Sequence, residues 1–199
     1  PAMIRIENVT KRFGAREAVR GVSLHLPRGT LCGLVGPDEA GKTTLLRMVA
    51  GVLAPTAGSI TVGGARGYMP QRFSLYEDCT VEENMTLFGT LQGLRGKDLP
   101  QRSQELLRRY DLLPFRDRLA GRLSGGMKQK LALSAALLSE PEVLILDEPD
   151  NYLDVPGKRW LEDQLRATQK TVLLVSHDRA LLARAATRIA AIELGAAGN

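Results

Sequence analysis

Several residue types are scarce in this sequence, and each scarcity excludes a class of protein. Only two cysteines, Cys32 and Cys79, occur among the 199 residues. Two cysteines without a short paired spacing indicate neither a disulfide framework nor a metal site built from thiolates, so a reducing compartment such as the cytoplasm is expected. Cys32 lies within an apolar run and is expected to fill part of the core.

Long hydrophobic runs are also lacking. No apolar stretch approaches the roughly 18 residues that a helix needs to span a bilayer, and candidates such as residues 172–175 have the length of strands. No secretory signal is visible either. We therefore expect no direct membrane insertion, so any membrane role would require a partner chain.

The charge balance is only mildly asymmetric. The net charge is +5, with 44% apolar and 25% charged residues, as in an ordinary globular protein. The basic residues are spread along the chain, which favours a solvated surface over a nucleic-acid or membrane patch. A length of 199 residues suits a single domain, 1–199, with a sizeable core.

The hydrophobic pattern predicts an α/β fold. Continuous apolar runs at 30–35, 143–146 and 171–175 are typical of buried parallel strands. Alternating patterns predict half-buried strands at 3–9 and 18–26. Further strands are expected at 59–62, 65–69 and 188–194, and helices at 42–50, 81–94, 99–110, 125–138, 157–167 and 179–186.

These elements are organised around a helical insertion. Strands alternate with helices in 1–71 and again in 141–199, which predicts a mainly parallel sheet with an antiparallel edge. Residues 72–140 read as a helical subdomain between these two parts, and Thr80 with Glu83 fits a capping box at its first helix.

A phosphate-binding loop follows the first buried strand. Residues 36–43 read GPDEAGKT and match the pattern G-x-x-x-x-G-K-[ST] of P-loop NTPases, between a predicted strand and a predicted helix. Backbone N–H groups of such a loop face the anion, the lysine reaches the β- and γ-phosphates, and the threonine hydroxyl can bind Mg²⁺. The expected nucleotide-binding residues here are Gly36, Pro37, Asp38, Glu39, Ala40, Gly41, Lys42, Thr43 and Thr44.

Glu39 is unusual within this loop. A carboxylate beside bound phosphates is unfavourable unless it points to solvent. If the backbone at this position has a positive φ, a glutamate is also strained there. We therefore predict that Glu39 weakens nucleotide binding.

Two acidic residues end a second buried strand. Residues 143–148 read VLILDE, which is the Walker B pattern. Asp147 would hold Mg²⁺, and Glu148 would act as the general base for an attacking water. Because ligands bind at the carboxyl ends of parallel strands, the phosphate loop, Asp147-Glu148 and His177 should converge on one site.

Taken together, these motifs resemble those of ABC-type ATPases, the nucleotide-binding domains of ABC transporters. The segment LSGGMKQ (123–129) is similar to the ABC signature, and it precedes VLILDEP as in that family. YMPQ (68–71), DNYLD (150–154) and SHD (176–178) resemble the family's Q-, D- and H-loops.

The resemblance implies roles for further residues. Phe13 would stack on adenine, although a core aromatic is the alternative. Gln71 would sense Mg²⁺ and the attacking water, and His177 would bind the γ-phosphate. Ser124, Gly125 and Gly126 would contact the nucleotide held by a second cassette, so ATP would drive the formation of a homodimer or heterodimer. The implied cofactors are ATP and Mg²⁺.

The sequence allows more than one interpretation of the biological role. Residues 68–89 resemble exporter ATPases that dock on a membrane-spanning subunit, at the cytoplasmic face of the membrane. The C-terminal third, including TVLLVSHDRALL (171–182), also resembles soluble ABC-F proteins of the ribosome, of which this chain would be a fragment or half. A third reading is a nucleotide-binding module whose turnover Glu39 impairs. We favour the transporter.

Overall fold

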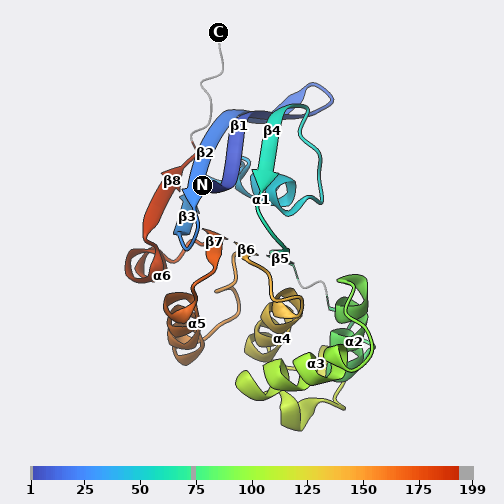
Figure 1. Cartoon of the computed structure of the whole chain (residues 1–199). Coiled ribbons are helices and arrows are strands. Elements are labelled where there is room, and N and C mark those ends of the chain that lie inside the picture. The colour runs from blue at the N-terminus through green and yellow to red at the C-terminus, as the bar shows by residue number, and fades with distance from the viewer. Residues whose placement is uncertain (1, 73–74, 193–199) are drawn as a thin grey trace.

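The structure is a computed structural model that describes residues 2–72 and 75–192. Within these residues two β-sheets pack with six α-helices (Figure 1). The strands are β1 (Ala2–Phe13), β2 (Arg16–Pro27), β3 (Leu31–Val35), β4 (Ala57–Val62), β5 (Arg66–Met69), β6 (Val143–Asp147), β7 (Thr171–Val175) and β8 (Arg188–Ala191). The helices are α1 (Lys42–Ala50), α2 (Val81–Leu91), α3 (Asp98–Arg109), α4 (Gly125–Leu137), α5 (Val155–Ala167) and α6 (Arg179–Ala185), with short 3₁₀ turns at Leu113–Phe115 and Ala120–Arg122.

The N-terminal strands form an antiparallel sheet of their own. Its order is β2-β1-β4, and Ile6 pairs with Leu24 on one side and Ile60 on the other. The antiparallel edge that we predicted is therefore a separate sheet. The expected strands on either side of the Gly63-Gly64 turn do not pair with each other, because β4 joins β1 and β5 joins β6 in the second sheet.

The second sheet is parallel throughout, as predicted. Its order is β5-β6-β7-β3-β8, and every residue of β6 and β7 is buried. Burial on both faces explains the continuous apolar runs in these strands. Because all five strands point the same way, the carboxyl ends of β3, β6 and β7 lie at one edge, where the phosphate loop, Asp147 and His177 begin.

Two hydrophobic clusters cover the two faces of the parallel sheet. One combines side chains of α1 and the antiparallel sheet with one face of the parallel sheet. The other combines α2, α3 and α4 with side chains such as Leu144 and Leu146 of the opposite face. Helices α2 and α3 form an arm at one end of the molecule (Figure 1), and the predicted capping box of α2 is present.

Some boundaries differ from the predictions. Strand β1 continues to Phe13 instead of ending at residue 9, because register shifts interrupt its alternating pattern without ending the pairing. Helix α5 begins at Val155 instead of 157, since the Asp154 side chain caps it by accepting a hydrogen bond from the Gly157 N–H. Strand β8 ends at Ala191, and positions 193–194 of the predicted strand lie outside the described residues.

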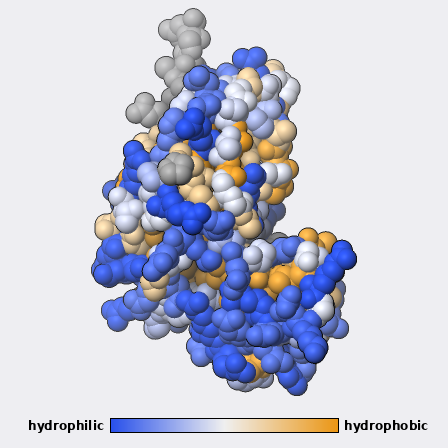
Figure 2. Space-filling model, viewed as in Figure 1, coloured by the Kyte–Doolittle hydropathy of each residue, from blue (hydrophilic) through white to orange (hydrophobic). Residues whose placement is uncertain are grey.

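Among the residues that the structure describes, no helix has the length and apolar character needed to cross a membrane. The surface in view is mostly hydrophilic, with a hydrophobic patch over α2 (Figure 2).

Candidate functional site

The phosphate loop joins β3 to α1 and leaves the start of that helix open to an anion. Gly41 is the N-cap residue and provides no side-chain hydrogen bond to the first turn, which also contains no acidic residue. The first N–H groups of a helix carry partial positive charge and lack partners within the helix. A phosphate group is the ligand that this helix end suits best.

Both glycines of the loop are required by close backbone contacts. Gly41 has a φ of 89°, and a Cβ there would lie 2.2 Å from the carbonyl oxygen of Ala18 in β2. A Cβ on Gly36 would lie 2.4 Å from the carbonyl oxygen of Ile192. These glycines let the loop pass tightly between neighbouring segments.

Lys42 is folded back onto the loop that it belongs to. Its Nζ donates hydrogen bonds to the carbonyl oxygens of Gly36, at 2.8 Å, and Pro37, at 2.7 Å. The Asp38 carboxylate lies 4.0 Å from the same atom. The ammonium group is therefore held at the centre of the loop, where a bound phosphate would attract it.

Asp147 and Thr43 form a pair with the chemistry of a Mg²⁺ site. The Thr43 hydroxyl donates to Oδ1 of Asp147 at 3.3 Å, and Asp147 is fully buried. Burial raises the pKa of Asp147 despite the opposing hydrogen bond from Thr43. Its Oδ2 is buried and has no hydrogen-bond partner among the described residues. An unpaired buried carboxylate oxygen beside a hydroxyl fits a hard cation such as Mg²⁺.

No group of three or more acidic, histidine or cysteine side chains that could hold a metal occurs in the described part of the chain. At phosphate sites Mg²⁺ is usually bound through one or two protein oxygens together with substrate phosphates and water.

Glu148 follows Asp147 and lines the same cavity as Lys42 and His177. Its Oε1 lies 3.1 Å from Nε2 of His177, and its Oε2 accepts a 2.6 Å hydrogen bond from Asn151. Burial opposes ionisation of Glu148, but hydrogen bonds from Asn151 and Gln71 and the proximity of His177 together lower its pKa. The carboxylate is thus kept charged and oriented, which a general base requires.

The backbone of Glu148 has a positive φ of 53°. A non-glycine residue in this region is strained, and such strain is typical of functional sites where the surrounding structure fixes an unusual geometry.

A second group of side chains lies at the other end of the site. Phe13 at the end of β1 is 51% exposed, so it is not a core aromatic. Arg16 at the start of β2 forms a 3.1 Å ion pair with Glu39. The backbone of Glu39 has a positive φ of 65°, so this residue is strained, as predicted from the sequence for a positive φ. Its side chain is largely exposed.

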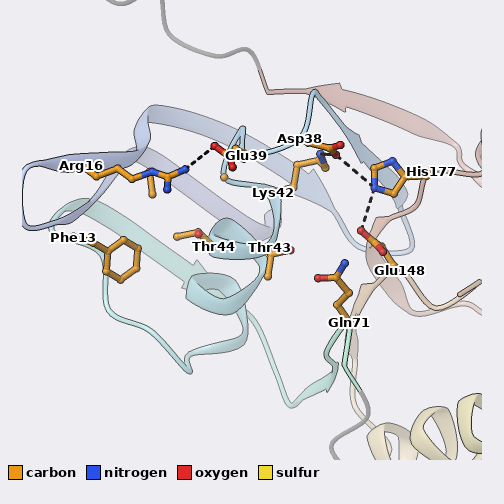
Figure 3. A pocket seen from close by; sticks show the side chains of 12 residues that line it. Phe13, Arg16, Asp38, Glu39, Lys42, Thr43, Thr44, Gln71, Glu148 and His177 are labelled. Atoms are coloured by element: carbon orange, nitrogen blue, oxygen red, sulfur yellow. Dashed lines mark hydrogen bonds and ion pairs between the residues drawn. The ribbon is translucent and has the colours of Figure 1, made fainter.

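One cavity of about 500 Å³ joins these two groups. Figure 3 shows Phe13 at one end and Glu148 with His177 at the other, with Lys42 and Thr43 between them. Its lining residues are Phe13, Arg16, Ala18, Asp38, Glu39, Gly41, Lys42, Thr43, Thr44, Gln71, Glu148 and His177.

Sequence reasoning missed two of these lining residues, Arg16 and Ala18. Arg16 belongs to none of the motifs found in the sequence, and its place three positions after Phe13 is the only feature that could have indicated it. Of the predicted loop residues, Gly36 and Pro37 contact Lys42 through their carbonyl groups, and Ala40 is buried against the core.

The signature residues Ser124, Gly125 and Gly126 lie elsewhere. They line a second cavity of about 460 Å³, together with Tyr152 and Trp160, and none of its lining residues borders the first cavity. Ser124 caps α4 by accepting a hydrogen bond from the Met127 N–H. Within one chain, the signature therefore does not reach the phosphate loop.

The geometry agrees with comparisons to known proteins. Residues 19–151 match the family model described as "ABC transporter". The chain belongs to the ABC transporter family. It is an ATP-binding cassette, the part of such proteins that binds ATP and hydrolyses it to ADP and phosphate.

Individual relatives support the assignment of this cassette. It is 46% identical over 174 residues to the probable multidrug ABC transporter ATP-binding protein YbhF of Escherichia coli K12, covering 80% of the cassette and 30% of YbhF. It is 35% identical over 195 residues to the ABC transporter ATP-binding protein NatA of Bacillus subtilis, covering 88% of the cassette and 79% of NatA.

A solved structure shares the same fold. The dimeric post-hydrolysis structure of the ATP-binding cassette MJ0796 with ADP and Pi superposes with a TM-score of 0.84. Its sequence is 26% identical, and the match covers 97% of each chain. The cassette thus spans nearly all of MJ0796 but less than a third of YbhF.

Proposed function

We propose that this cassette powers a membrane-spanning partner by hydrolysing Mg²⁺-bound ATP between two cassettes. The observation that carries the proposal is the convergence of Lys42, Thr43, Glu148 and His177 on one cavity, with Asp147 directly behind Thr43. This arrangement provides the components that phosphoryl transfer to water requires: phosphate ligands, a metal site and a base.

The nucleotide would lie along the cavity from Phe13 to His177. Phe13 stacks on the adenine ring, and the loop residues from Gly36 to Thr44 enclose the phosphates. Lys42 binds the β- and γ-phosphates. We propose that Thr43 and Asp147 would hold Mg²⁺, with Gln71 in the lining of the same cavity. The metal neutralises charge on the phosphate oxygens.

Glu148 and His177 act at the γ-phosphate end. Glu148 accepts a proton from the attacking water, whose oxygen forms the new bond to phosphorus while the bond to the β–γ bridging oxygen breaks. His177 donates a hydrogen bond to the γ-phosphate, and the Glu148 carboxylate 3.1 Å away orients its ring.

Ser124, Gly125 and Gly126 serve the nucleotide of a second cassette. Their separation from the first cavity in one chain supports this role, because they can complete a nucleotide site only across an interface. The dimeric MJ0796 structures share the fold of this chain. We propose that two cassettes enclose two ATP molecules in head-to-tail order. One chain then forms a single domain in which the helical subdomain of residues 72–140 carries the signature at the start of α4.

The arm also offers a surface for the membrane partner. Leu91 at the end of α2 is 71% exposed, and Tyr76, whose ring lies against Phe88 of the same helix, is 54% exposed. Figure 2 shows a hydrophobic patch over α2. Exposed apolar patches of this kind mark interaction sites. The relatives YbhF and NatA are named as ATP-binding proteins of ABC transporters, which favours a membrane subunit at the cytoplasmic face over the ribosome as the partner.

The test compares the chain with its Glu148→Gln variant. We expect the unaltered chain to hydrolyse ATP. The variant should bind ATP with similar affinity, lose turnover and accumulate as a dimer in size-exclusion chromatography. Glu105→Gln, a change at an exposed carboxylate on α3, is the matched control and should retain full activity. Turnover by Glu148→Gln at the unaltered rate would refute the assigned base.

A further inference from the structure

A chain of hydrogen bonds joins the helix that carries the signature to Glu148. Gln129 lies in the second turn of α4 and is 3% exposed, and its Nε2 donates to the main-chain oxygen of Asn151 at 2.7 Å. The Asn151 side chain donates in turn to Oε2 of Glu148 at 2.6 Å. Helix α4 is thus connected to Glu148 through Asn151, which lies three residues after Glu148 in the turn that follows β6.

We propose that Asn151 and Gln129 are positioning residues that set the orientation of the Glu148 carboxylate and make it depend on the position of α4. The inference rests on the proposed role of Glu148 as the base. Neither residue touches the cavity in which the nucleotide would lie, so each acts through another residue.

The two oxygens of Glu148 have different partners, which fixes the carboxylate plane. Oε2 is held by Asn151, and Oε1 lies beside His177. If the Asn151 contact were lost, Glu148 would keep only its contacts with His177 and Gln71, and the carboxylate could rotate more freely about its terminal bond. Side chains that act on a reacting water need close alignment, and a displacement of about 1 Å can reduce the rate by about 100-fold.

The turn that carries Asn151 needs support from outside. It lies between Glu148, with a φ of 53°, and Tyr152, with a φ of 63°. Strained backbone of this kind persists only where neighbouring groups determine it. Gln129 supplies such a contact, and its buried amide would itself be unfavourable without a partner.

The same contact gives α4 an influence on the base. The helix begins at Gly125, capped by Ser124, and Gln129 follows little more than one turn later. A shift of α4, such as the docking of a second cassette's nucleotide at Ser124 would cause, moves Gln129 with it. The base of one nucleotide site would then respond to occupancy of the other.

The experiment measures kcat and ATP affinity separately in the full chain. We expect Asn151→Ala to lower kcat about ten-fold with an ATP Kd within two-fold of the unaltered chain. Asn151→Ser, which keeps a hydrogen-bond donor, should recover part of the rate. Gln129→Met keeps the side-chain volume without the donor and should lower kcat by a smaller factor. The double variant should be no slower than Asn151→Ala alone, because both residues act on one group.

Ser134→Ala is the matched control for general loosening of α4. Ser134 is buried in the same helix and donates to the Lys130 carbonyl oxygen, away from Glu148. This variant should retain the unaltered kcat even if the helix loses some stability.

The outcomes separate this inference from the proposed function. If the unaltered chain turns over, Glu148→Gln is inactive and Asn151→Ala is fully active, the inference is overturned and the function stands. Additive losses in the double variant would overturn the link through Gln129. Turnover that survives Glu148→Gln would overturn the role of the base and the inference together.

Discussion

Arg16 and Glu39 form an ion pair in the lining of the cavity beside the phosphate loop, with Nη2 of Arg16 3.1 Å from Oε2 of Glu39 (Figure 3). Arg16 comes from β2, and Glu39 sits in the phosphate loop with a backbone φ of 65°. The Glu39 carboxylate is paired with Arg16, and its side chain is 78% exposed. This pairing therefore offsets part of the repulsion that an acidic loop residue exerts on phosphate.

Replacing Glu39 with glycine should improve both stability and nucleotide binding. A left-handed backbone costs a non-glycine residue about 1 kcal/mol, so we expect a gain of that order in the free energy of unfolding. ATP affinity should rise roughly five-fold, the effect of one unit charge about 4 Å away in water. Glu39→Gln removes the charge but not the strain, and should improve affinity alone. Equal ATP affinities in all three proteins, measured by titration, would show that Glu39 has no effect on binding.

The exposed ring of Phe13 should contribute to nucleotide binding and little to folding. We expect Phe13→Ala to weaken ATP binding about ten-fold, since stacking on a base contributes roughly 1–3 kcal/mol. Binding of inorganic tripolyphosphate, which has no base, should not change. Phe13→Tyr keeps the ring and is the control. If Phe13→Ala weakened the binding of ATP and of tripolyphosphate equally, the cause would be damage to the phosphate loop and not the loss of stacking.

Removal of the buried charge at Asp147 should increase the stability of the fold and abolish the effect of Mg²⁺ on ATP binding. Without Mg²⁺ the ionised carboxylate is buried with one unpartnered oxygen, so Asp147→Asn should raise the free energy of unfolding by roughly 1 kcal/mol in EDTA. Mg²⁺ should no longer strengthen ATP binding by the variant. Asp150→Asn is the control, because Asp150 is also buried and its Oδ1 has no hydrogen-bond partner among the described residues. It should keep the Mg²⁺ effect, and loss of that effect in both variants would contradict the assignment.

Asp178 should give the fold a stabilisation that depends on pH. It caps α6 and pairs with Lys158 at 2.9 Å, and this hydrogen bond, with those from the helix N–H groups, lowers its pKa. A lowered pKa in the folded state means that the contribution is complete above the ordinary value of about 3.9 and is lost as the pH falls through the folded value. Asp178→Ala should therefore cost about 1 kcal/mol at neutral pH, measured by urea unfolding. A difference that persisted undiminished at pH values below the folded pKa would contradict this account.

The phosphate loop and the helix after it were predictable because their signals are local. The glycines, the lysine and the apolar spacing act within a dozen residues, and α1 was predicted at its observed bounds, Lys42–Ala50. The buried strands β6 and β7 were predicted almost as well, because burial on both faces imposes continuous apolar runs.

Contacts between distant segments were less predictable. Nothing local indicates that β4 pairs with β1 while β5 crosses to the other sheet. The position of Arg16 beside Glu39, 23 residues later, depends on how the β1–β2 hairpin folds over the loop. The contact of Gln129 with Asn151 depends likewise on the packing of α4 against the turn after β6.

The two cavities of this chain share no lining residue, and this has a genetic consequence. If each nucleotide site is composite, it combines Lys42 of one subunit with Ser124 of the other. In a mixed dimer, one subunit is defective at Lys42 and the other at Ser124, and the two defects then lie in the same site. The other site has neither defect. Two separately inactive alleles could then restore one working site when expressed together, whereas either allele alone would yield none.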